Sequence, residues 1–552
     1  DTKQAMGPPI ENGFYYDFEF KTPISEEDFP KIEKKMRQIL GGWRKFEKKE
    51  ASIEEARDVF RSNKYKLELI AEFAKEGKKL TIYQCGNYVD LCKGGHVENP
   101  SKEIGALKIL NLAGAYWRGS EKNKMLTRIY ATCFPTENEL KAYLNMLEEA
   151  KKRDHKILGP QLGLFMFHET SPGMPYWLPE GLAIYNKLID FWRKEHLRQR
   201  YKEIFSPLIN KKELYVTSGH WEHYKEHMFI APAGENETYC LKPMNCPNAM
   251  IVFQSTQRSY KDLPLRLSDT DRLHRFEKSG TLNGLLRVRS FQQDDSHNFI
   301  TEDMIGKEYA HLFELCEKFY SIFGLKYKFR FGTRPEKFIG EAKTWDKAEA
   351  TLKEILKKSK VPYSTLEGDG AFYGPKVDIL MSDALGREWQ MGTFQLDFQL
   401  PQRFNLKYMD KDGKEKTPVV VHRVIYGSLE RFIGIIIEHF AGAFPVWLAP
   451  IQIALIPISE KHDEYLANVR EKLLKMHEEI KIKEFSDSET LQKRIRNAQM
   501  AKIPYMIVLG DKEEKNKTLN IRLRSGEVLG EMSVEKFAQR LKEKIESKAL
   551  DL

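Results

Sequence analysis

The chain has 552 residues, a formal net charge of +9, 41% hydrophobic residues and 31% charged residues. Its length predicts about three to four domains, and its composition excludes a disordered or fibrous protein. The mild positive charge permits a polyanionic partner without requiring one, because a solvated surface of mixed charge gives the same value.

The number and spacing of the cysteines and the hydropathy of the chain indicate the cellular compartment of the protein. Six cysteines, none in a CxxC pair, stand at positions 85, 92, 133, 240, 246 and 316. This spacing fits a reducing cytoplasm, where a cysteine belongs to a core, a metal site or a nucleophile rather than a disulfide. One apolar stretch, 440–458, is long enough to span a membrane, but Gly442 and three prolines within it would break a spanning helix. We therefore expect a cytoplasmic protein with no membrane partner.

Residues 1–134 mix strand and helix patterns. Turn signals at 7–9 and 12–13 precede an aromatic strand at 14–20. Because the chain opens at Asp1 without a methionine and enters this pattern at once, we expect it to begin inside a domain. Residues 135–157 predict a linker helix with a capping box of Thr136 and Glu139, ending in the polar run 151–156.

Two further domains are predicted after the linker. Residues 158–449 hold many aromatic-rich strands and few long helices, which predicts an α+β domain with a mostly antiparallel sheet. In residues 450–552, strands at 451–458, 480–485, 505–509 and 519–523 alternate with helical patterns near 461–476, 489–501 and 533–546. This alternation predicts a small α/β domain with a largely parallel sheet.

Reactive side chains concentrate in the segment 271–297. It holds the arginines Arg272, Arg275, Arg287 and Arg289, with the carboxylates Glu277, Asp294 and Asp295 among them. Arginines along a hairpin suit a polyphosphate, because the guanidinium group binds phosphate bidentately. The alternative is a charged hairpin that faces solvent.

A second reactive segment is 422–432, which runs into an apolar helix. Arg431 stands at the entry to that helix, where an arginine is costly unless it is paired or bound to an anion. Cys246, His297 and His422 are metal candidates, but spacing alone does not select them from 6 cysteines and 14 histidines. Cys92 and His96, four residues apart, could share a zinc ion, form a thiolate–imidazole pair, or do neither.

Several strings in the chain resemble bacterial-type threonyl-tRNA synthetases, in the family's order and over the whole chain. They are GFYYDF at 13–18, DLCKGGH at 90–96, AGAYWRG at 113–119, KPMNCP at 242–247, HRFE at 274–277, RVRSFQQDDSH at 287–297, DGAFYGPK at 369–376, HRVIYGSLERF at 422–432 and IPYMIVLGDKE at 503–513.

The resemblance implies a domain order and a nucleotide site. Residues 1–134 would be an editing-type domain, 135–157 the linker, 158–449 a class II catalytic core with an antiparallel sheet, and 450–552 an anticodon-binding domain. Arg275 would hold the α-phosphate of ATP, Glu277 would read adenine, Arg287 would be a further phosphate contact, and Arg431 would clamp the γ-phosphate. ATP would enter with Mg²⁺, and chemistry of this kind depends on positioning and charge stabilisation.

The resemblance also implies one zinc ion, held by Cys246, His297 and His422, that recognises L-threonine. Asp295 would bind the threonine hydroxyl, with Met244, Tyr373, Gln390 and Gln395 nearby. Glu513 and Arg522 would read the anticodon of tRNA(Thr). Pro207 lies in the string that resembles the dimer-interface motif, which implies a homodimer.

The chain departs from the family in three places. The family's editing site combines an upstream HxxxH with the Asp90, Cys92 and His96 segment, and no HxxxH precedes that segment here, so we expect loss of serine editing. Gly95 replaces the usual proline, and Asn248-Ala249 replaces Gly-His. Other readings are a prolyl- or seryl-type class II synthetase, a non-catalytic RNA-binding paralogue, and a zinc hydrolase with Asp295 as its base.

Overall fold

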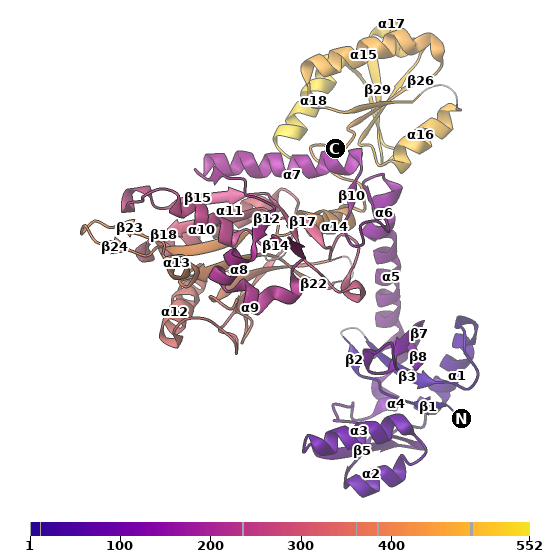
Figure 1. Cartoon of the computed structure of the whole chain (residues 1–552). Coiled ribbons are helices and arrows are strands. Elements are labelled where there is room, and N and C mark those ends of the chain that lie inside the picture. Colours follow the sequence, from indigo (N-terminus) through magenta and orange to yellow (C-terminus); the bar gives the residue numbers. More distant parts are fainter. Residues whose placement is uncertain (1, 11–12, 235–236, 360, 384–385, 486–488) are drawn as a thin grey trace. The chain divides into compact units, whose positions relative to one another are not determined.

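The computed structural model describes residues 2–10, 13–234, 237–359, 361–383, 386–485 and 489–552 (Figure 1). Packing of the backbone divides the chain into two compact units, residues 1–149 and 150–552. Each unit has its own hydrophobic core, with Ile70 and Ile82 at the centre of one and Ile436 and Phe394 at the centre of the other.

The first unit contains two antiparallel sheets. The larger has the order β1-β3-β8-β7, with β2 paired to β3, and the smaller has the order β4-β5-β6. The expected aromatic strand is β3, which pairs with β8 from Phe14–Ala131 to Phe18–Thr127. The strands are β1 (Lys3–Gln4), β2 (Pro9–Ile10), β3 (Gly13–Glu19), β4 (Glu47–Ala51), β5 (Leu80–Cys85), β6 (Tyr88–Leu91), β7 (Ala106–Tyr116) and β8 (Met125–Phe134). The helices are α1 (Phe29–Leu40), α2 (Ile53–Val59), α3 (Lys64–Lys75) and α4 (Pro100–Glu103).

The expected linker helix is α5 (Glu137–Arg153). Its capping box forms as predicted, because the Glu139 amide donates to Thr136 Oγ1 at 3.2 Å and the Thr136 amide donates to the Glu139 carboxylate at 3.0 Å. The helix ends within the polar run, at Arg153. Asp154 instead caps a new short helix, α6 (His155–Gln161), by accepting from the Lys156 amide at 2.8 Å.

An eight-stranded sheet forms the centre of the second unit. Its order is β11-β15-β18-β25-β22-β21-β19-β20, and all neighbours are antiparallel except the parallel pairs β11–β15 and β19–β20 at its edges. This confirms the predicted antiparallel class II core. The strands are β11 (Lys202–Glu203), β15 (Leu265–Asp269), β18 (Asp295–Ile300), β19 (Lys328–Gly332), β20 (Tyr363–Leu366), β21 (Lys376–Ser382), β22 (Glu388–Asp397) and β25 (Val419–Val424).

Helices and smaller strands surround this sheet (Figure 1). The helices are α7 (Pro179–Arg198), α8 (Lys212–Ser218), α9 (His220–Tyr224), α10 (Cys246–Gln254), α11 (Ile305–Ser321), α12 (Ala342–Ser359), α13 (Leu400–Arg403) and α14 (Leu429–Phe440). The smaller strands are β9 (Phe165–Met166), β10 (Tyr176–Trp177), β12 (Ile209–Lys211), β13 (Ile230–Ala233), β14 (Glu237–Leu241), β16 (Arg272–His274), β17 (Ser290–Gln292), β23 (Tyr408–Met409) and β24 (Glu415–Lys416). With both faces covered, β18 and β25 are buried at every residue.

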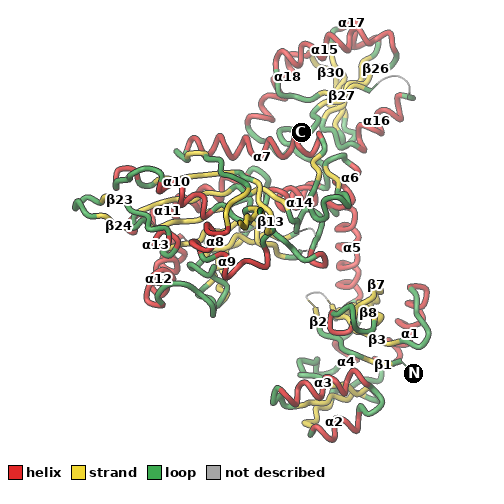
Figure 2. The backbone as a smooth tube through the Cα atoms, viewed as in Figure 1, coloured by secondary structure: helices red, strands yellow, loops and turns green. Residues whose placement is uncertain are grey.

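The C-terminal part of the second unit is a five-stranded sheet of order β27-β26-β28-β29-β30, with helices around it (Figure 2). The strands are β26 (Ile453–Pro457), β27 (Ile482–Glu484), β28 (Tyr505–Leu509), β29 (Thr518–Leu523) and β30 (Val528–Ser533). The helices are α15 (Asp463–Met476), α16 (Leu491–Met500), α17 (Asp511–Asn516) and α18 (Val534–Glu546).

The prediction of a largely parallel sheet here is wrong for half of the strand pairs. β26 pairs in parallel with β27 and β28, but β28–β29 and β29–β30 are antiparallel. The segment between β28 and β29 contains only the short helix α17, and a parallel crossover needs a dozen or more residues. Strand β30 was not predicted, and Gly530 breaks its strand pattern.

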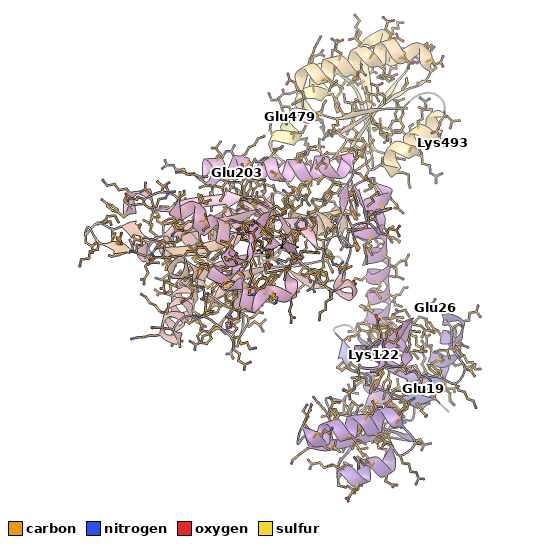
Figure 3. All side chains as sticks on the ribbon, in the orientation of Figure 1. Glu19, Glu26, Lys122, Glu203, Glu479 and Lys493 are labelled. Carbon is orange, nitrogen blue, oxygen red and sulfur yellow. The ribbon has the colours of Figure 1, made fainter. Side chains whose placement is uncertain are left out.

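The apolar stretch 440–458 is not one helix, as its glycine and prolines predict, but consists of the end of α14, an irregular segment and the buried strand β26. Within the described residues, every helix is too short or too polar to cross a bilayer. Charged side chains of both signs lie on the outside of the second unit, for example Glu203, Glu479 and Lys493 (Figure 3).

Candidate functional site

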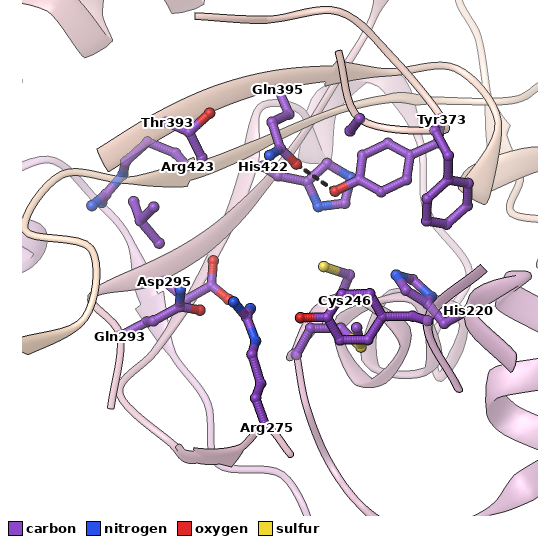
Figure 4. A pocket seen from close by; sticks show the side chains of 15 residues that line it. His220, Cys246, Arg275, Gln293, Asp295, Tyr373, Thr393, Gln395, His422 and Arg423 are labelled. Atoms are coloured by element: carbon purple, nitrogen blue, oxygen red, sulfur yellow. Dashed lines mark hydrogen bonds between the residues drawn. The ribbon is translucent and has the colours of Figure 1, made fainter. Parts of the chain in front are cut away.

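A cavity of about 240 Å³ opens beside β18, β22 and β25. In the view of Figure 4, side chains from β22 and β25 form its upper side, while Asp295, Arg275, Cys246 and His220 form its lower side. The residues predicted from the sequence that line it are Met244, Cys246, Arg275, Asp295, Tyr373, Gln395 and His422. Residues from five separate segments therefore meet at one place.

The three metal candidates come together beside this cavity. His297 on β18 is the direct partner of His422 on β25 in the antiparallel register, and their rings are 4.9 Å apart. Cys246 begins α10, and its Sγ lies within 4.8 Å of the ring nitrogens of both histidines. All three residues are buried. A trigonal Cys–His–His set is a donor set that zinc accepts, with a fourth position left open.

The electrostatics of this cluster favour a cation. Among the described residues, both ring nitrogens of His297 and Nδ1 of His422 are buried without a hydrogen-bond partner. Burial, His422 and Arg423 lower the pKa of His297 well below its usual value, so its imidazole is neutral and has a lone pair to give. Burial raises the pKa of the Cys246 thiol well above its usual value, a desolvation penalty that a bound cation would offset.

The carboxylate of Asp397 orients the His422 ring. His422 Nε2 lies 2.8 Å from Asp397 Oδ2, while Asp397 Oδ1 accepts from the amides of Gln399 and Leu400. Since a carboxylate accepts, Nε2 carries the hydrogen and Nδ1 keeps its lone pair. A histidine that ligates a metal is commonly held in this way by a carboxylate on its other nitrogen.

The expected amino-acid pocket adjoins the cluster. Burial raises the pKa of Asp295 to about 6, and its carboxylate accepts from Asn245 Nδ2 at 3.1 Å. Tyr373 donates its hydroxyl hydrogen to Gln395 Oε1, and both side chains line the cavity (Figure 4). Gln390 lies elsewhere, because its Nε2 donates to Asp378 Oδ1 at 2.7 Å and it is not among the residues that line the cavity.

The arginines of the predicted nucleotide site gather around the loop between β16 and β17. Arg275 Nε donates to the Pro243 carbonyl at 3.1 Å, and Arg287 Nε donates to the Glu277 carboxylate at 3.0 Å. Arg431, from the first turn of α14, donates to the carbonyls of Leu286 at 2.8 Å and Gln390 at 2.5 Å. Burial, Arg275 and Arg287 together lower the pKa of Arg431 to about 10. Guanidinium groups that repel one another across a partly buried site indicate a polyanionic ligand.

Sequence reasoning missed several residues of the cavity wall, of which His220 and Arg423 have titratable or charged side chains. His220 follows the left-handed Gly219 at the start of α9, and burial lowers its pKa to about 3. Arg423 follows His422 on β25 and hydrogen-bonds with Asp294 at 3.2 Å and with His196. A charged residue within the apolar string VVVHRV was the available signal for Arg423. The lone His220 had no such signal.

In the first unit, the residues that resemble an editing site are engaged with their neighbours. Asp90 pairs with Lys66 and accepts from the Tyr88 hydroxyl at 3.1 Å. The His96 ring packs against Phe46, with ring centroids 4.2 Å apart, and against Tyr83 at 4.6 Å. Cys92 Sγ accepts from the Gly94 amide at 3.4 Å.

The structure explains one of the three departures from the family strings. Gly95 has a φ of +87°, a conformation that a proline ring, fixed near −65°, cannot adopt. The backbone here therefore differs from one that a proline would allow. Asn248 and Ala249 are buried in α10, and nothing in the structure explains that replacement.

The two predicted anticodon residues occupy different settings. Glu513 is buried, and its carboxylate accepts from the Gly510 amide at 3.0 Å, which caps α17. Arg522 lies on β29, where it pairs with Met506 of β28 beside a bulge in the β29–β30 register, and its side chain is partly exposed.

Three known domain families match the chain. They are the tRNA synthetase class II core domain (G, H, P, S and T) at residues 228–440, an anticodon binding domain at 452–544, and the threonyl and alanyl tRNA synthetase second additional domain at 80–130.

Relatives and solved structures agree with this assignment. A threonine–tRNA ligase of Caldanaerobacter subterraneus subsp. tengcongensis is 48% identical over 552 residues, which is 100% of this chain and 85% of the relative. A crystal structure of the RNA binding domain of threonyl-tRNA synthetase from Cryptosporidium parvum is 40% identical with a TM-score of 0.68, over 71% of this chain and 98% of that one. A prolyl-tRNA synthetase from the same organism has a TM-score of 0.55 and 15% identity, over 71% of this chain and 74% of that one, so it shares the fold alone. The chain belongs to the threonine–tRNA ligase family of class II aminoacyl-tRNA synthetases.

Proposed function

We propose that this threonine–tRNA ligase recognises L-threonine through a zinc ion held by Cys246, His297 and His422. The single observation that supports this most strongly is the buried His297, whose two ring nitrogens lack partners within the described residues while a thiol and a second imidazole lie within 4.8 Å. When bound, zinc would supply coordination to the amino and hydroxyl groups of an amino acid, since a zinc ion with three protein ligands has an open position and can expand to five-coordinate.

The protein residues around the proposed zinc site would favour threonine over valine, which has nearly the same shape. Asp295 faces the cavity with a carboxylate that can accept the threonine hydroxyl hydrogen. Valine lacks that hydroxyl and would leave the carboxylate unpaired, and sites built for a bonded hydroxyl reject such analogues by roughly 10⁴–10⁵. Serine keeps the hydroxyl and lacks only a methyl, which is worth about 1–3 kcal/mol, so this pocket alone would discriminate weakly against serine.

The arginines would bind ATP, which would enter with Mg²⁺. Arg275 would face the α-phosphate, where charge builds as the threonine carboxylate attacks, while Arg287 and Arg431 would bind the outer phosphates and Glu277 the adenine amino group. Burial and the repulsion from Arg275 and Arg287 lower the Arg431 pKa, which supports this role, because an anion between the guanidinium groups would offset both effects. The contribution of the protein is then orientation and charge stabilisation.

A homodimer is proposed from the exposed apolar surface of the second unit. Leu197 at the end of α7 is 79% exposed and Phe205 is 88% exposed, close in sequence to Pro207 of the expected interface motif. Exposed apolar patches mark interaction surfaces, and these two side chains shortly precede the expected interface motif in the sequence. Analytical ultracentrifugation tests the proposal, and a monomer at micromolar concentration would contradict it.

All six cysteines are free, which agrees with the proposed cytoplasmic location.

The first prediction concerns the metal. Purified protein should contain one zinc ion per chain, and Cys246→Ser should lose it together with threonine-dependent ATP–pyrophosphate exchange, because a three-ligand site cannot spare its thiolate. Cys316→Ser is the matched control, since Cys316 is also a buried, free thiol of the second unit. Full zinc occupancy in Cys246→Ser would show that the ligands are wrong.

The second prediction concerns ATP. Arg275→Ala and Arg431→Ala should each lower the rate of adenylate formation by about 10²–10³, the effect of removing one donor aimed at a charged transition state. Arg334→Ala should leave the rate near normal, because Arg334 is paired with Asp346 outside the cavity. Near-normal exchange in either of the first two variants would contradict the assignment.

The third prediction concerns tRNA. Arg522→Ala should weaken aminoacylation of tRNA(Thr) by about 10–100-fold, since one base contact is worth roughly 1–3 kcal/mol, and it should leave pyrophosphate exchange unchanged. Arg470→Ala removes the same charge from the same domain and serves as the control. Equal effects of the two variants would indicate a general charge effect and refute base reading by Arg522.

The fourth prediction concerns serine. We propose that a protein of these 552 residues charges tRNA without clearing serine from it. His96 is the one histidine in residues 1–149, and ester hydrolysis needs both a positioned water and a polarised carbonyl. Deacylation of pre-charged seryl-tRNA measures this directly. A rate well above the uncatalysed one, abolished by Cys92→Ala, would disprove the proposal.

A further inference from the structure

A buried histidine outside the cavity joins three segments of the second unit. His155, the first residue of α6, is 1% exposed. Its Nδ1 lies 2.7 Å from Glu438 Oε1 on α14, and the Leu285 amide donates to its Nε2 at 3.1 Å. With Asp154 nearby, this group has the composition of a metal site.

The hydrogen bonds around His155 speak against a metal. A backbone amide can only donate, so Nε2 carries the lone pair and the ring hydrogen sits on Nδ1, from which it is donated to the Glu438 carboxylate. Both ring nitrogens are thus used by the protein. This differs from His297, whose nitrogens lack partners in the described part of the chain.

The contacts of His155 lead directly to the proposed ATP site. Leu285 belongs to a tight turn in which the Leu286 amide donates to the Asn283 carbonyl at 2.9 Å and Arg287 closes the turn opposite Asn283. The Leu286 carbonyl then accepts from Arg431 Nε at 2.8 Å. His155 therefore holds the turn that ends in Arg287 and that orients Arg431.

The same imidazole also fixes the helix that carries Arg431. Glu438 follows Arg431 on α14 by seven residues, which is two helical turns and places both on one side of the helix. His155 thus contacts α14 at Glu438 while it holds the turn that meets α14 at Arg431. Two glycines permit this close packing. A Cβ on Gly284 would lie 2.2 Å from His155 Nε2, and one on Gly434 would lie 3.0 Å from Leu286 Cδ2.

We propose that His155 is a positioning residue for ATP, which holds the turn 283–287 against α14 so that Arg287 and Arg431 face the phosphates together. Guanidinium groups that repel one another move apart unless the backbone beneath them is fixed, and His155 supplies two hydrogen bonds to that backbone and helix. This inference rests on the proposed role of Arg431 in ATP binding.

Steady-state pyrophosphate exchange by His155→Ala and the milder His155→Gln tests the inference. In His155→Ala, kcat/KM for ATP should fall about tenfold, the effect of leaving a buried hydrogen-bond partner unpaired. The KM for threonine should change by less than about twofold, and zinc content should be unchanged, because the amino-acid pocket lies on other elements. His155→Gln, which keeps one donor and one acceptor, should recover part of the loss. His477→Ala, on α15's end in the C-terminal domain, is the histidine control for an assay that contains no tRNA.

A double-mutant cycle approaches the same contact from the loop. Gly284→Ala should lower kcat/KM for ATP in the otherwise unchanged chain. It should have a smaller but not a zero effect in the His155→Ala background, because the ring that the new methyl group meets at 2.2 Å is then absent, while Lys156 Cγ at 2.7 Å and the positive φ of residue 284 remain. Strictly additive effects, or a parallel rise in the KM values for ATP and threonine, would overturn the inference. Normal exchange in Arg431→Ala would instead overturn the ATP assignment itself, so the two failures are distinguishable. A second metal ion per chain, lost in His155→Ala, would show a metal site and also overturn the inference.

Discussion

The burial of two adjacent histidines on fully buried strands is the constraint on which the site depends. β18 and β25 are covered on both faces, so each polar side chain on them requires a partner. His422 has Asp397 on one nitrogen, but its other nitrogen and both nitrogens of His297 remain without partners among the described residues. A cation that also bound the Cys246 thiolate would satisfy these atoms together. The sheet would then carry the pocket outward from the proposed cation. Residues 295 and 297 are two apart on one strand and share a face, which places the Asp295 carboxylate beside the proposed metal.

The nucleotide side of the site depends on the opposite condition, an excess of like charge. Arg275, Arg287 and Arg431 converge with Glu277 as their nearby carboxylate, and burial together with the repulsion from Arg275 and Arg287 lowers the pKa of Arg431. Such an arrangement is stable only if the backbone holds it, and the turn 283–287 with α14 provides that frame. The stability of the turn 283–287 and α14 would therefore rise when a polyphosphate binds, because the ligand would remove the repulsion between the guanidinium groups.

The amino-acid sequence predicted the fold class and most elements, because local patterns and the family strings specify them. The capping box of Thr136 and Glu139 and the strand at 505–509 need only local rules. The proposed metal ligands were predicted from the family strings and not from spacing, since 246, 297 and 422 become neighbours only through the pairing of β18 with β25 and the packing of α10. That pairing is a tertiary fact with no local signature. The antiparallel end of the C-terminal sheet was missed because the sequence pattern of a strand does not indicate its direction. The short segment between β28 and β29 does indicate it, because a parallel connection needs a longer segment.

The residues that were hardest to predict are those whose place depends on the local backbone conformation. His155 stood in a polar run that read as the end of a linker helix, yet Asp154 ends α5 and starts α6, which turns His155 inward. Gln390 matched a family position, but its side chain donates to Asp378, beside a register shift between β21 and β22. Gly95 was an unexplained replacement until its backbone conformation was seen. In each case the backbone conformation decides how the residue is placed, and the residue type permits that conformation without requiring it.

Amino-acid-dependent ATP–pyrophosphate exchange tests the central claim, that a zinc-centred pocket selects threonine, most directly. The account predicts strong exchange with threonine, exchange with serine reduced by roughly 10–200-fold, and exchange with valine reduced by roughly 10⁴ or more. Exchange with valine within about tenfold of that with threonine would contradict it, because a pocket built around a bonded hydroxyl cannot accept an amino acid that lacks one.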